Sequence, residues 1–104
     1  MKLVLRNQDI KRVLIGAPKG HRHIRVVIET EDLVIVLQEA TLANIVRAYV
    51  TVKTHPTRSA IELKQTKLEH RKEGYAKCQL LETEKPCEEI SEEISTIIYS
   101  TPSS

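Results

Sequence analysis

The first 38 residues carry apolar side chains in short segments separated by turn-prone residues. Val, Ile and Leu dominate these segments, and β-branched side chains pack well on a pleated sheet. Within the third segment the side chains alternate between apolar and polar or charged, the period-two pattern of a half-buried strand. The pattern predicts an antiparallel meander of four strands, at residues 2–6, 10–16, 22–30 and 33–37.

Two tight turns fit between these predicted strands. In residues 17–20 Pro18 presets one backbone dihedral and Gly20 accepts a positive φ, so the strands on either side are expected to pair as a hairpin. Glu31 and Asp32 form the second, charged turn. The apolar strand that follows it is expected in the middle of the sheet.

The period of the apolar residues then changes to three and four, which is typical of a helix. The sequence predicts a helix over residues 41–53 that packs on the sheet, with Thr41 at its N-terminus. Pro56 ends it, because proline disfavours the helical conformation of the residue before it. The apolar stripe of this helix comprises Leu42, Ile45, Val46, Tyr49 and Val50.

Residues 59–69 and 75–81 return to period two. They predict a second hairpin whose turn is the charged segment 70–74. The good helix formers in 60–69 leave a helix open as the alternative for that segment.

The last predicted element is a helix over residues 86–99 with an isoleucine stripe opposite its glutamates. The chain is therefore expected to be a single α+β domain over residues 1–99. Its mostly antiparallel sheet, a four-stranded meander plus a second hairpin, is packed by a central and a C-terminal helix. Residues 100–104 are expected to fray.

Charge is distributed unevenly along the chain. Residues 1–77 hold 15 Lys and Arg against 8 Asp and Glu, whereas residues 78–104 hold 1 against 6. A basic body favours an anionic partner, unless the acidic C-terminal helix lies over it and neutralises it. The longest apolar run has five residues, so no membrane span or signal peptide is predicted, and the cytoplasm is the expected location.

The nine predicted binding residues are cationic or imidazole side chains. Six belong to the first hairpin and three to the connector after the central helix, where they could neutralise the phosphates of a nucleic acid. The alternative is a hairpin tip that only water contacts and a plain connector. The residues are Lys11, Arg12, Lys19, Arg22, His23 and Arg25 in the hairpin, and Lys53, His55 and Arg58 in the connector.

Metal and cofactor sites are not expected from the motifs. His21 and His23 share a strand face, but two imidazoles lack the further ligands that zinc requires. The spacing of Cys78 and Cys87 matches neither a zinc site nor a redox motif. Both cysteines are expected to be reduced core residues. A disulfide is the alternative, given a charged, isoleucine-rich and glycine-poor composition compatible with a thermophile.

Three functions follow from these patterns. The first is a non-catalytic binding module whose basic hairpin contacts nucleic acid or another polyanion. The second is a homo-oligomeric interaction module without a ligand, in which Val27, Val34 and Val36 or the isoleucine stripe meet a second copy. The third is a small phosphodiester hydrolase with His55 or His23 as base; no nucleophile or phosphate-loop motif supports it, and no catalytic residue is assigned.

Overall fold

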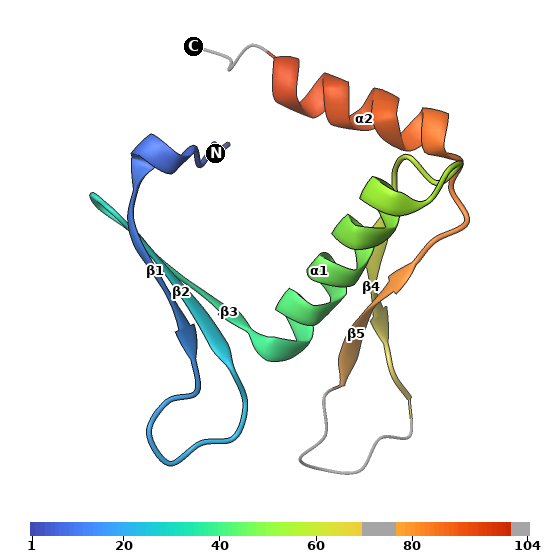
Figure 1. Cartoon of the computed structure of the whole chain (residues 1–104). Coiled ribbons are helices and arrows are strands. Elements are labelled where there is room, and N and C mark those ends of the chain that lie inside the picture. Colours follow the sequence, from blue (N-terminus) through green and yellow to red (C-terminus); the bar gives the residue numbers. More distant parts are fainter. Residues whose placement is uncertain (70–76, 101–104) are drawn as a thin grey trace. The chain divides into compact units, whose positions relative to one another are not determined.

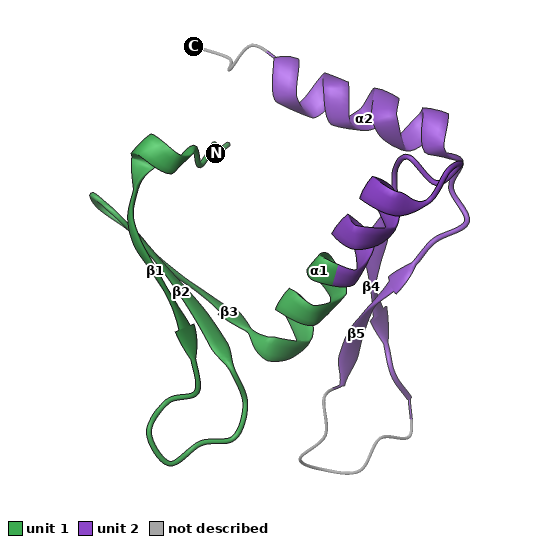
Figure 2. Ribbon diagram, in the orientation of Figure 1, with its two compact units in different colours: residues 1–46 green, residues 47–104 purple. Residues whose placement is uncertain are grey.

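The computed structural model describes residues 1–69 and 77–100. It is an α+β protein with antiparallel sheets and two α-helices (Figure 1). The chain divides into two compact units, Met1–Val46 and Arg47–Ser104, which Figure 2 colours separately. Each unit is described by itself below. That residues 1–99 form a single domain stays a prediction.

Unit 1 contains a three-stranded antiparallel sheet in the order β1-β2-β3. The strands are β1 (Ile10–Gly16), β2 (Arg25–Thr30) and β3 (Val34–Gln38). The hairpin predicted across residues 17–20 is confirmed, although β2 begins three residues later than expected. The apolar strand β3 lies at an edge of the described sheet, with β2 in the middle.

The predicted first strand, residues 2–6, is wrong, so the meander has three strands and not four. That segment has no regular structure and leads into a 3-10 turn, η1 (Asn7–Asp9). The carboxylate of Asp9 accepts hydrogen bonds from the backbone N–H and from Nε of Arg6, each at 3.0 Å. This capped turn ends the extended chain, and the pairing of β1 with β2 begins at Ile10, opposite Thr30, where β2 ends.

Both predicted turns of the sheet are present. Gly20 has φ +82°, and the backbone N–H of His21 donates to the carbonyl of Pro18 at 2.9 Å. The left-handed conformation at Gly20 is the one that a residue without Cβ adopts at low cost. At the second turn the N–H of Thr30 donates to the carbonyl of Leu33 at 2.9 Å, which closes a turn around Glu31 and Asp32.

The register of the strands gives the sheet two faces. Directly paired residues share a face, so one face, which we call the apolar face, carries only aliphatic side chains in the centre of the sheet. The opposite face mixes aliphatic side chains with an ion pair and is called the mixed face. The apolar face comprises Val13, Ile15, Val26, Ile28, Ile35 and Leu37; the mixed face comprises Arg12, Leu14, Val27, Glu29, Val34 and Val36.

The central helix is confirmed as α1 (Glu39–Thr54), two residues longer at its N-terminus than the predicted segment and one at its C-terminus. It ends before Pro56, and the N–H of His55 still donates to the carbonyl of Thr51 at 2.8 Å. No residue of α1 is buried, and Tyr49 and Val50 in its stripe are exposed. The packing of this helix on the sheet stays a prediction.

Unit 2 contains the second hairpin and the C-terminal helix. Strand β4 (Leu63–Lys67) pairs antiparallel with β5 (Cys78–Glu82). Of the two alternatives for residues 60–69, strand and helix, the structure therefore has the strand. The predicted turn at 70–74 lies outside the described residues. Helix α2 (Cys87–Tyr99) follows Pro86 as expected, and Ile90 is buried on it, at 6% exposure.

The cysteines differ from one another in exposure. Both are free thiols, so the disulfide alternative is not present. Cys78 is exposed on β5, which corrects the expectation that it is a core residue, while Cys87 is half-buried at the start of α2. Side chains of a strand point to the faces of the sheet, so Cys78 is exposed because no described segment covers its face of β5. Among the described residues no helix has the length and apolar character needed to cross a membrane.

Candidate anion-binding site

Two of the five Lys and Arg side chains in the hairpin are neutralised by carboxylates of unit 1. Arg12 lies directly opposite Glu29, and its guanidinium forms two hydrogen bonds to that carboxylate, one of them at 3.2 Å. These bonds lower the pKa of Glu29. Lys11 Nζ lies 3.3 Å from Oε2 of Glu31. A polyanion at this strand would therefore compete with two existing ion pairs.

His23 and Arg25 are also engaged. The Nδ1 atom of His23 lies 2.9 Å from Oε2 of Glu39, the first residue of α1. Arg25 donates to the carbonyls of His23 and Ile24 at 3.0 and 3.4 Å. The His23 side chain is 75% exposed, so its ring stands in water and not in a cleft.

Three hairpin cations form no ion pair with a described residue: Lys19, Arg22 and Arg25. Arg25 donates to backbone carbonyls, whereas Lys19 and Arg22 make no side-chain hydrogen bond to the described residues. Both are exposed, and the connecting loop, residues 17–24, contains no acidic residue. Within unit 1 this loop therefore keeps its positive charge available to a partner.

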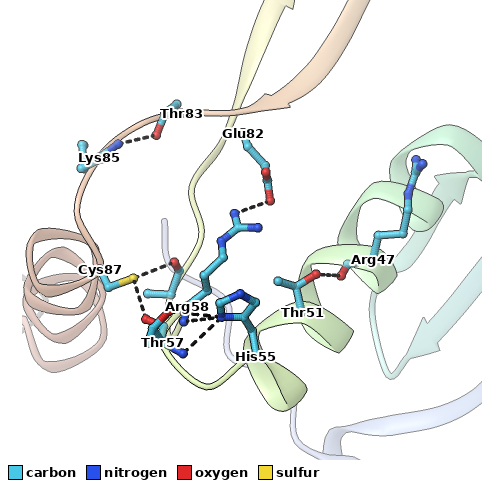
Figure 3. Close-up of polar contacts among 10 residues, drawn as sticks. Arg47, Thr51, His55, Thr57, Arg58, Glu82, Thr83, Lys85 and Cys87 are labelled. Atoms are coloured by element: carbon cyan, nitrogen blue, oxygen red, sulfur yellow. Dashed lines mark hydrogen bonds and ion pairs between the residues drawn. The ribbon is translucent and has the colours of Figure 1, made fainter.

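The three connector residues lie in unit 2, and Figure 3 shows two of them, His55 and Arg58. The Nδ1 atom of His55 accepts hydrogen bonds from the backbone N–H groups of Thr57 and Arg58, both at 3.1 Å. These two hydrogen bonds hold the turn after α1. Because Nδ1 accepts them through its lone pair, the ring proton of the neutral imidazole is on Nε2. Arg58 donates to Oε1 of Glu82 on β5 at 2.8 Å. Lys53 is exposed in the last turn of α1.

A lysine outside the predicted site holds the segment before α2. Lys85 Nζ lies 3.1 Å from Oε2 of Glu62 and 2.9 Å from Oε2 of Glu93, and the hydroxyl of Thr83 donates to Glu62 at 2.8 Å. These hydrogen bonds raise the pKa of Lys85 and lower that of Glu62. The sequence signal for this residue is that Lys85 is the single cation among residues 78–104.

The thiol of Cys87 has a structural position in the same region (Figure 3). Its Sγ donates to the carbonyl of Ala60 at 3.5 Å and to that of Thr57 at 3.8 Å. These contacts tie the start of α2 to the segment between α1 and β4. Ala60 is buried at 8% exposure, so this is one of the better packed parts of unit 2.

The predicted site is thus divided. Six of its nine residues lie in unit 1 and three in unit 2, and carboxylates face Lys11, Arg12, His23 and Arg58. Over residues 1–69 and 77–100 no group of three or more His, Cys, Asp or Glu side chains could hold a metal ion. Comparisons with known protein families, with curated proteins and with solved structures found no match to this chain.

Many large apolar side chains are exposed. Among the described residues the buried hydrophobic ones are Val26, Ala60 and Ile90. Both faces of the unit 1 sheet carry exposed aliphatic side chains: Val13 (46%) and Ile15 (67%) on the apolar face, and Leu14 (46%), Val34 (64%) and Val36 (55%) on the mixed face. On α2, Ile94, Ile97 and Ile98 are exposed beyond the buried Ile90.

Proposed function

We propose that this protein is a non-catalytic interaction module that assembles with a second copy of itself. The observation that carries the proposal is the unit 1 sheet, whose two faces both expose aliphatic side chains. Sheets with apolar residues on both faces are typical of proteins in which both faces are covered. Burying one Val, Leu or Ile side chain is worth about 1.5–3 kcal/mol, so covering such faces stabilises an assembly strongly.

A second copy is the partner that needs no further assumption. Other segments of the same chain can cover one face of the sheet, and the remaining face then needs a surface of similar apolar character. A second copy supplies that surface, and a two-fold axis lets the same residues contact one another. Large exposed apolar patches are in any case uncommon on monomeric proteins.

Sedimentation equilibrium of the full chain tests the proposal. We expect a species of twice the 11.8 kDa chain mass at micromolar concentration. Val36→Lys places a charge on the mixed face at β3, whereas Lys64→Glu changes a charge on the exposed side of β4 and serves as the control. The first variant should weaken assembly and the second should not. A single species of 11.8 kDa for the wild type at all micromolar concentrations contradicts the proposal.

Polyanion binding is retained as a second candidate, restricted to the loop 17–24. The observation in its favour is that Lys19 and Arg22 are exposed and form no ion pair with described residues. Two such cations give weak contacts with phosphates, and these contacts weaken steeply as salt rises. Hydrolysis of phosphodiesters has no comparable support, because Nδ1 of His55 is occupied by two backbone N–H groups.

A further inference from the structure

We propose that the second copy joins through strand β3, whose free edge pairs antiparallel with β3 of the other chain. This inference rests on the proposed self-assembly and names its surface. Strand β3 is an edge of the described sheet, and its five residues, VIVLQ, bear no charge. Each of the other four strands in the described residues carries at least one Lys, Arg or Glu.

Charge at an edge strand matters because natural proteins use it to keep free edges from pairing with other chains. Lysine, arginine and local bulges are common protections. The opposite edge of this sheet, β1, carries the basic residues Lys11 and Arg12. It also has a register shift between Ile10 and Arg12. An unprotected edge such as β3 is expected where pairing is part of the assembly.

The hydrogen-bond pattern shows which groups of β3 are free to pair. Thr30 N–H donates to Leu33, so this pair is hydrogen-bonded within the hairpin. Bonded and non-bonded pairs alternate in an antiparallel ladder, so Ile35 and Leu37 bond to β2. The N–H and C=O groups of Val34 and Val36, and the N–H group of Gln38, therefore point to the open edge.

A two-fold axis at Val36 matches these groups with themselves. The two Val36 residues exchange both of their hydrogen bonds, and each Gln38 N–H donates to the Val34 carbonyl of the second copy. This register uses the whole strand and places no charge opposite another within it. It also sets Ile35 opposite Leu37 of the second copy, so that the apolar faces of the two sheets become continuous.

Proline scanning of the two edges tests this pairing. Val36→Pro removes the N–H at the centre of the proposed axis, once in each chain. The matched control is Val13→Pro on β1: Val13 pairs with Ile28, which bonds to β3, so the Val13 N–H also points away from the sheet. We expect Val36→Pro to weaken dimerisation on the order of 30-fold and Val13→Pro to leave it unchanged.

Amide hydrogen exchange of the wild type gives a second measurement that needs no variant. The amides of Val36 and Gln38 should exchange slowly above the dimer dissociation constant and quickly below it. The amides of Val13 and Ile15 should exchange quickly at both concentrations.

The outcomes separate the two proposals. A dimer that Val36→Pro and Val13→Pro affect equally, or whose β3 amides exchange at the same rate at both concentrations, overturns the β3 pairing and leaves self-assembly standing. A wild type that stays monomeric overturns both. Circular dichroism of each variant checks that it is folded, and if Val36→Pro unfolds, the exchange measurement decides.

Discussion

The substitution Ile90→Ala in α2 should destabilise the chain far more than Ile97→Ala on the same helix. Ile90 is 6% exposed and Ile97 is 62% exposed. Truncation to alanine removes three carbons, which is about 2.4 kcal/mol of transfer free energy at a buried site, and the cavity left behind brings the total to about 2–5 kcal/mol. At Ile97 less than half of the side chain is covered, so the cost should be about 1 kcal/mol.

Urea unfolding followed by circular dichroism measures the loss of unfolding free energy that each substitution causes. The experiment is run at a concentration where sedimentation gives a monomer, so that no second copy covers Ile97. For a domain of this size each kcal/mol shifts the melting temperature by roughly 4–8 °C, so thermal unfolding gives an independent check. Equal destabilisation by the two substitutions would refute the assignment of Ile90 as the buried position of α2.

Three further predictions concern other parts of the chain. Gly20→Ala should cost about 1–2 kcal/mol because φ is +82°, whereas Gly16→Ala, with no atom near its added Cβ, should be nearly neutral in thermal unfolding. The pKa of Glu62 is lowered, so its carboxylate stabilises the folded chain above the unfolded pKa and loses this effect as the pH falls through the folded pKa. Glu62→Gln should accordingly be less stable than wild type in urea at neutral pH and equal to it near about pH 2. If the loop 17–24 contacts nucleic acid, charge reversal of Lys19 and Arg22 together should reduce both the affinity and its salt dependence in a fluorescence titration; an unchanged salt slope would argue against the contact.

Sequence periodicity predicted the elements that local interactions determine. The helices at 41–53 and 86–99 and the hairpin around Gly20 follow from spacing and turn chemistry, which a chain carries in a few neighbouring residues. Residues 2–6 resemble a strand in composition just as closely. A strand also needs a neighbour to pair with, and the Arg6 and Asp9 cap ends the extended segment before β1 begins.

The candidate site was less accessible to prediction, because three of its cations, Lys11, Arg12 and Arg58, are paired with carboxylates distant in sequence. Arg12 meets Glu29 across the sheet, and the register shift after Ile10 that sets this pairing has no obvious sequence signal. The exposure of the aliphatic side chains on β3 was equally difficult to predict from the sequence. The aliphatic residues of β3 read as core, and only the order of the strands shows that this strand is an edge.

The bulge in β1 has a consequence for the size of any assembly. A sheet that could grow at both edges would add chains without limit and end as a fibre, as open head-to-tail contacts do. Here the register shift between Ile10 and Arg12 and the neighbouring basic side chains interrupt one side. Growth through β3 would then stop after a single addition, giving a closed pair and not a polymer.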